Sequence, residues 1–122
     1  MPVRERPSAP RPFAITVARH PRAVVVAVRG ELDHHTATQL RAVLNDVHRE
    51  EPQVIVIDLH DVSLLASAGL AALIAAHDQA LPDTEVRLVA TSATPAMRSV
   101  RLTGLEELFV VHATAEAALK AS

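Results

Sequence analysis

The chain has 122 residues, which is enough for one domain that buries a hydrophobic core of its own. It contains no cysteine, so disulfide bonds, thiolate metal sites and cysteine nucleophiles are excluded. The formal net charge is -2, with acids and bases mixed along the chain, and aromatic residues make up 2% of it. We therefore expect no nucleic-acid partner.

The N-terminal residues 1–12 differ in composition from the rest of the chain. They hold four prolines and three arginines and are followed by no long apolar stretch, which predicts a disordered tail and not a secretory signal. The longest apolar stretch, residues 64–76, contains Ser67 and is too short to span a bilayer. We expect a cytoplasmic protein without membrane contact, whose single domain is residues 13–122.

The rest of the chain alternates between apolar, β-branched runs and segments with helical periodicity. In chain order we predict strands at 13–19 and 23–28, a helix ending near Arg49, a strand at 54–59, a helix at 68–81, a strand at 86–90, a helix at 95–102, a strand at 108–111 and a helix ending near Lys120.

Capping residues mark where several of these helices begin. Asp33 is a candidate N-cap of the first helix, and Thr36 with Gln39 has the spacing of a capping box. Thr94 is a candidate N-cap before Pro95, and a third threonine, at position 114, starts the last helix.

The element order β-β-α-β-α-β-α-β-α predicts an α/β fold with a mixed, mainly parallel sheet, whose first strand is an antiparallel edge. Functional loops of such sheets gather at the carboxyl ends of the strands. Two loops are predicted there, residues 30–36 after the second strand and residues 60–69 after the third.

Ser67 directly precedes an alanine-rich helix and has three interpretations. It can be interpreted as an ordinary N-cap, as a phosphoacceptor or as a nucleophile. A helix start stabilises an anion through free backbone N–H groups and the macrodipole, which suits a phosphoserine. A hydrolase elbow requires glycine two residues before the serine, where this chain has Leu65, and no histidine and aspartate are evidently placed for a triad.

The loop at residues 30–36 offers polar side chains but no evident cofactor site. His34 and His35 are adjacent, and neighbouring residues rarely point toward one metal ion. The three glycines are far apart, so no glycine-rich phosphate loop exists. We predict no metal and no cofactor. Asp33 is either a simple helix cap or, if the two loops lie side by side, a hydrogen-bond partner of the Ser67 region.

The helix after Ser67 has two kinds of apolar residue. Its larger side chains are expected to form a core face, made of Leu70, Leu73, Ile74 and Leu81. Its small alanines are either packed within the domain or form a smooth exposed strip that docks a partner.

At these positions the sequence resembles a STAS domain, and more closely the bacterial anti-sigma factor antagonists. The resemblance covers nearly all of the chain after residue 12, in the right order and spacing. It depends on four blocks: Gly30-Glu31-Leu32-Asp33 with His34-His35-Thr36-Ala37; Ile55-Val56-Ile57-Asp58-Leu59 with Val62-Ser63; Ser67-Ala68-Gly69-Leu70; and Ala90-Thr91-Ser92-Ala93-Thr94-Pro95 with Leu102-Thr103-Gly104-Leu105.

The resemblance implies a regulatory binding protein and not an enzyme. Such a domain binds an anti-sigma factor, often a serine kinase, and thereby frees a sigma factor. The kinase phosphorylates one serine, here matched by Ser67, which ends the binding, and a phosphatase resets the protein. The implied partner surface consists of Glu31, Asp33, His34, Ser67, Ala68, Gly69, Leu70 and Ala71.

One departure from the family pattern leaves alternatives open. The family motif commonly reads Asp-Ser-Ser/Thr-Gly-Leu, whereas alanine stands on both sides of Ser67 here. The chain is therefore a switched antagonist, an unswitched binder, or the substrate of a different kinase. A ligand- or nucleotide-sensing STAS module is the alternative function. We expect a monomer, because nothing in the sequence requires a dimer.

Overall fold

The computed structural model describes residues 12–80 and 82–121. Its elements are β1 (Ala14–Arg19), β2 (Ala23–Leu32), α1 (His34–Arg49), β3 (Val54–Leu65), α2 (Ser67–Gln79), β4 (Glu85–Val89), α3 (Pro95–Leu102), the 3-10 helix η1 (Leu105–Glu107), β5 (Val110–His112) and α4 (Ala115–Lys120). Of the predicted tail, residues 1–11 lie outside the described residues. The order of strands and α-helices is the predicted one.

The strands form one sheet in the order β1-β2-β3-β4-β5. β1 pairs antiparallel with β2, and the other neighbouring strands pair in parallel. The predicted α/β fold with a mainly parallel sheet and an antiparallel edge is therefore confirmed.

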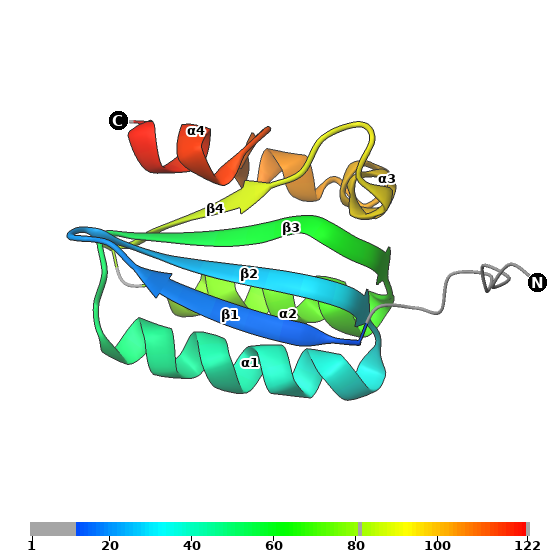
Figure 1. Cartoon of the computed structure of the whole chain (residues 1–122), viewed down its shortest axis with the longest axis horizontal. Coiled ribbons are helices and arrows are strands. Elements are labelled where there is room, and N and C mark those ends of the chain that lie inside the picture. Colours follow the sequence, from blue (N-terminus) through cyan, green and yellow to red (C-terminus); the bar gives the residue numbers. More distant parts are fainter. Residues whose placement is uncertain (1–11, 81, 122) are drawn as a thin grey trace, which may run out of the picture.

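Helices cover both faces of the sheet (Figure 1). On one face, Val26, Ile57 and Leu88 of the central strands share a core with residues of α1, α2 and α3. On the other face, Val25 and Val56 pack with Ala118 of α4. The central strands are buried on both sides, which explains why their sequences are continuously apolar.

The start of α1 confirms Asp33 as its cap and corrects the second capping signal. The Asp33 side chain accepts hydrogen bonds from the backbone N–H groups of His35 and Thr36, and the Asp33 N–H donates to Thr36 Oγ1. The capping box is therefore Asp33 with Thr36, not Thr36 with Gln39, because the helix already begins at His34.

The other predicted threonine caps differ from one another. Thr114 accepts a hydrogen bond from the backbone N–H of Ala117 at the start of α4, as expected. Thr94 does occupy the N-cap of α3, but its Oγ1 accepts from the N–H of Thr91 and not from the helix.

The largest correction concerns the two loops predicted at the carboxyl ends of the strands. β2 continues to Leu32 and β3 to Leu65, and these extensions pair with each other up to Leu32 opposite Leu65. Two register shifts interrupt the pairing, and Gly30, with φ of 98°, lies beside the second. The strand extensions contain polar residues, which end the apolar runs, and the bulged register accommodates them. Because the apolar pattern stops there, the sequence alone predicted loops.

The core face of α2 also differs from the predicted one. Its buried residues are Gly69, Ala72, Leu73 and Ala76. Leu73 was expected there, but Ile74 is 39% exposed, and Leu81 lies outside the described residues. Because α2 packs beside α1, its small alanines occupy the interface and the larger Ile74 faces outward. The last strand begins at Val110, since η1 and Leu108 precede it.

Candidate functional site

Ser67 lies at the junction between the sheet and α2. It is the first residue of the helix and is exposed. Ala66 separates it from β3, and the Ala66 N–H donates a hydrogen bond of 2.9 Å to the carbonyl oxygen of Leu32. The ends of β2 and β3 therefore fix where α2 starts and present Ser67 at the carboxyl end of the sheet.

Ser67 is not the N-cap that one interpretation assumed. The N-cap of α2 is Ala66, which has no side chain able to accept from the first helical turn. No side-chain cap satisfies the first-turn N–H groups of α2, whereas α1 and α4 have such caps. Free N–H groups at a helix start favour an anion. The Ser67 hydroxyl itself makes no hydrogen bond within residues 12–80 and 82–121.

Gly69 allows α2 to approach the strand ends this closely. A Cβ atom at this position would lie 2.7 Å from Leu65 Cδ1, 3.0 Å from Leu32 Cβ and 3.2 Å from the Leu32 carbonyl oxygen. Any side chain would require either the Leu65 side chain or the start of α2 to shift. Gly69 is buried, so within the predicted partner surface its role is to position Ser67.

Asp33 belongs to the start of α1, and its carboxylate is used there. Its Oδ1 accepts from His35 N and Thr36 N at 2.9 Å each and lies 3.1 Å from Thr36 Oγ1. These bonds, chiefly the one from the Thr36 backbone, hold the pKa of Asp33 below its ordinary value. Between the two described residues Asp33 and Ser67 there is no hydrogen bond, so the idea that Asp33 orients the serine hydroxyl is wrong.

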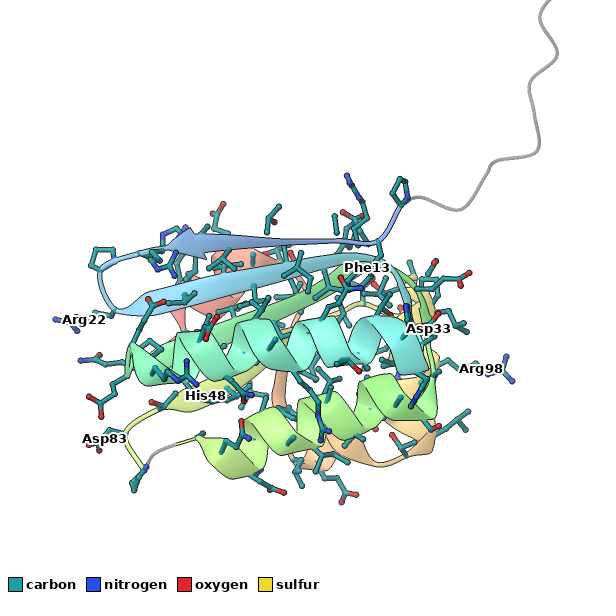
Figure 2. The ribbon with its side chains drawn as sticks, turned by 90° about the horizontal axis from the view of Figure 1, so that it is seen from below. Phe13, Arg22, Asp33, His48, Asp83 and Arg98 are labelled. Carbon is teal, nitrogen blue, oxygen red and sulfur yellow. The ribbon has the colours of Figure 1, made fainter. Side chains whose placement is uncertain are left out.

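The remaining predicted surface residues come from the same end of the molecule. Glu31 is exposed near the end of β2, and His34 is exposed at the first position of α1. Along α2, Ala71 is exposed, whereas Ala68 and Leu70 are half-buried and pack against the core. Figure 2 shows Asp33 at this end and Asp83 at the opposite end.

Sequence reasoning missed three exposed apolar side chains, each on an element that leads to or from this site. Leu64 at the end of β3 is 48% exposed, Ile74 on α2 is 39% exposed, and Leu102 on α3 is 76% exposed. The hydroxyl of Ser99 ties α3 to the end of β3 by donating to the Leu65 carbonyl oxygen at 3.3 Å. For Leu102 a signal existed, since it lies four residues after the exposed Arg98, on the polar side of α3.

The described residues show no further candidate chemistry. Within residues 12–80 and 82–121, no group of three or more histidine, cysteine, aspartate or glutamate side chains is arranged to hold a metal ion. No helix in the same ranges is long and apolar enough to cross a membrane.

Comparison with known proteins identifies the family. The family model of the STAS domain matches residues 14–118. The anti-sigma-F factor antagonist RsfB of Mycobacterium tuberculosis is 33% identical over 112 residues, which are 92% of this chain and 91% of RsfB. The chain therefore belongs to the STAS domain family of anti-sigma factor antagonists.

Solved structures agree with this assignment. The crystal structure of an anti-sigma factor antagonist from Mycobacterium paratuberculosis matches with a TM-score of 0.78 and 32% identity, covering 92% of this chain and 95% of that one. The antagonist SpoIIAA in its unphosphorylated form shares the fold, with a TM-score of 0.72 and 24% identity, over 87% of this chain and 93% of SpoIIAA.

Proposed function

We propose that this chain is an anti-sigma factor antagonist that binds an anti-sigma factor and thereby releases a sigma factor, and that phosphorylation of Ser67 ends the binding. The observation that carries the proposal is an exposed serine at the first position of α2, a helix whose first turn has no side-chain cap. The similarity of the whole domain to RsfB supports the kind of partner.

The partner surface in this proposal is the carboxyl end of the sheet. Glu31, Asp33 and His34 supply a polar rim from β2 and α1. At the start of α2, the exposed Ser67 and Ala71 and the half-buried Ala68 and Leu70 supply a surface without a charged side chain. Leu64 extends it with apolar area that is accessible to a partner. A buried apolar centre with a polar rim is the usual composition of a protein interface.

Phosphorylation changes the charge of this surface and is compatible with the folded domain. A phosphate adds about -1.5 to -2 charges at neutral pH. At the start of α2 the free N–H groups and the helix macrodipole favour such an anion, so the domain remains folded. A partner that desolvates the same surface must then bury or repel that charge, and its affinity falls.

The chemistry of the switch belongs to the partners. We propose that the anti-sigma factor is a serine kinase which acts on Ser67, that a phosphatase removes the phosphate, and that the exchange takes place in the cytoplasm. The chain itself acts as the substrate and the binding protein, not as an enzyme. The alanines at positions 66 and 68 leave the serine without a neighbouring acid or hydroxyl, so recognition by the kinase depends on the docked surface.

The experiment begins with isolation of the anti-sigma factor on the immobilised full chain, followed by addition of ATP and measurement of the intact mass of the chain. We expect one added phosphate on the wild type and on the control Ser63→Ala, whose serine is exposed in β3 four residues before the site. Ser67→Ala should bind and gain no phosphate, and Ser67→Asp should bind at least about tenfold more weakly, since a charge buried without a partner costs more than about 1.4 kcal/mol.

Three outcomes would contradict this proposal in part or as a whole. Phosphate on Ser67→Ala would show that the modified residue lies elsewhere. A bound anti-sigma factor that never phosphorylates the wild type would leave an unswitched antagonist. Absence of any anti-sigma factor among the bound proteins would contradict the antagonist function itself.

A further inference from the structure

Helix α3 is anchored beside the junction between β3 and α2. The hydroxyl of Ser99 on α3 donates a hydrogen bond of 3.3 Å to the carbonyl oxygen of Leu65, two residues before Ser67. Figure 1 shows α3 at the end of the sheet where β3 leads into α2. The buried side of α3 packs into the core that also holds Leu65, through Ala96, Met97 and Val100. The residues next to Ser99 are therefore held near Ser67.

Arg98 is the cation that α3 presents at this junction. Successive residues of an α-helix lie about 100° apart around its axis, so Arg98 is on the flank next to Ser99, whereas Arg101 is about 160° away from Ser99. Arg98 is exposed, and Figure 2 shows it at the same end of the molecule as Asp33. Among the residues that the structure describes, its guanidinium has no ion pair or hydrogen bond. It is thus available for an anion.

A second exposed arginine near the strand ends, Arg29 on β2, belongs to the other face of the sheet. Its neighbour Val28 is buried in the core that the sheet shares with α1, α2 and α3. Successive side chains of a strand point to opposite faces, so Arg29 lies on the face that α4 covers. The face of the sheet therefore separates Arg29 from Ser67, and Arg98 is better placed.

A phosphate on Ser67 would match the charge and the geometry of this free guanidinium. The phosphate adds about -1.5 to -2 charges at neutral pH, together with strong acceptor oxygens. Arginine pairs with phosphate through two parallel hydrogen bonds, which are stronger than neutral hydrogen bonds and fix the orientation of both groups. The first-turn N–H groups of α2 and the Arg98 guanidinium would then hold the phosphate from two elements.

We propose that Arg98 pairs with the phosphate on Ser67 and positions it over the start of α2. This inference rests on the proposed phosphorylation of Ser67. It adds a second component to the switch: the pair joins α3 to α2 across the surface that the partner needs, so a partner must break the pair as well as meet the added charge.

The test uses the full chain with phosphoserine incorporated at position 67 during translation, so no kinase is required. The second pKa of the phosphate is measured by ³¹P NMR titration in the wild type and in Arg98→Gln. A cation that pairs with the dianion favours it, so we expect the wild-type value to lie about half a pH unit below that of Arg98→Gln. The difference should shrink in about 1 M salt. Arg98→Lys should lie between the two, since lysine keeps the charge without the planar fork.

Two further variants serve as matched controls. Arg101→Gln removes the same charge from the far flank of the same helix, and Arg29→Gln removes it from the other face of the sheet. Both should titrate as the wild type does. His34 and His35 are also exposed at the start of α1, but every variant retains them, so a difference between variants reports on the arginine that was replaced.

Two results would overturn the proposal. Identical titration of the wild type and Arg98→Gln would show that Arg98 does not pair with the phosphate. An equal shift in Arg101→Gln would show only the effect of net charge.

These outcomes are separable from the fate of the proposed function. Because the phosphoserine is built in, the titration reports on the pairing with Arg98 whether or not an anti-sigma kinase modifies Ser67. The ATP reaction with the bound anti-sigma factor tests the modification whether or not Arg98 contributes.

Discussion

Two helices begin side by side at the carboxyl end of the sheet, and their starts are built in opposite ways. α1 begins with a complete capping box, in which Asp33 and Thr36 satisfy each other's backbone N–H groups. α2 begins after Ala66, which has no side-chain cap, and exposes Ser67 at its first position. Asp33, which the sequence left open as a cap or as a partner of the Ser67 region, is thus a structural cap, while the start of α2 without a cap is available for a phosphate.

The difference has a physical consequence for the two sites. At α1, the acceptor that the first turn needs is supplied within the fold, so an external anion gains little there. At α2, the close approach at Gly69 holds the helix against β2 and β3, and packing stabilises the start instead of a cap. Because packing holds the start of α2 in place, the helix needs no cap there, and its first N–H groups stay free for a ligand.

The largest expected effect follows from removing that packing. Gly69→Ala places a Cβ atom 2.7 Å from Leu65 Cδ1 and 3.2 Å from the Leu32 carbonyl oxygen, so the buried Leu65 side chain or the start of α2 must shift. We expect the free energy of unfolding to fall by about 1–3 kcal/mol, as for other overpacked sites. Chemical denaturation followed by circular dichroism measures it. An unchanged or higher stability, as helix propensity alone would give, would contradict the close-packing explanation.

The next effect is smaller and concerns the cap of α1. Asp33→Ala removes both hydrogen bonds to the first turn, and we expect a loss of about 1 kcal/mol in the free energy of unfolding. Because the pKa of Asp33 is lowered in the folded state, its contribution is complete above the ordinary aspartate pKa and is lost as the pH falls through the folded value. A variant that keeps wild-type stability at neutral pH would show that the capping box is not stabilising.

The converse change sharpens the comparison at α2. Ala66→Ser supplies the missing side-chain acceptor, and we expect a gain of up to about 1 kcal/mol in the free energy of unfolding. The new hydroxyl competes with a phosphate for the same N–H groups, so the phosphorylated variant should gain less from its phosphate than the wild type. Equal stability of Ala66→Ser and the wild type would mean that the N–H groups of α2 already have adequate partners.

The smallest effect is expected at the far end of α1, where His48 packs against α2. Burial lowers the pKa of His48, and the carbonyl of Ala76 opposes this only in part. The unfolded chain therefore binds more protons, so this contribution is complete above the ordinary histidine pKa and is lost as the pH falls below it through the lower folded value. Among the residues that the structure describes, the buried His48 Nε2 has no hydrogen-bond partner. Denaturation between about pH 7.5 and 5 should show a shallower pH dependence for His48→Gln. An identical slope would exclude His48 as the cause.

The sequence predicted the fold better than the details of the site. Apolar runs such as residues 54–57 identify central strands because burial on both faces demands them. The bulged pairing of β2 with β3 up to Leu65 could not be predicted, because it depends on partners distant in sequence. That pairing sets where α2 begins and packs, so the sequence alone did not show that Ala66 precedes the helix as its N-cap. It also did not show that Ile74 faces outward.

The central claim is that phosphate on Ser67 is accepted by the fold and rejected by the partner. The most direct measurement compares the full chain with and without phosphoserine at position 67, recording both its free energy of unfolding and its affinity for the isolated anti-sigma factor by calorimetry. We predict that the free energy of unfolding is unchanged or higher and that the affinity falls at least about tenfold, a change of about 1.4 kcal/mol or more. Equal affinity of the two forms, or a phosphorylated form that unfolds more easily, would contradict the account.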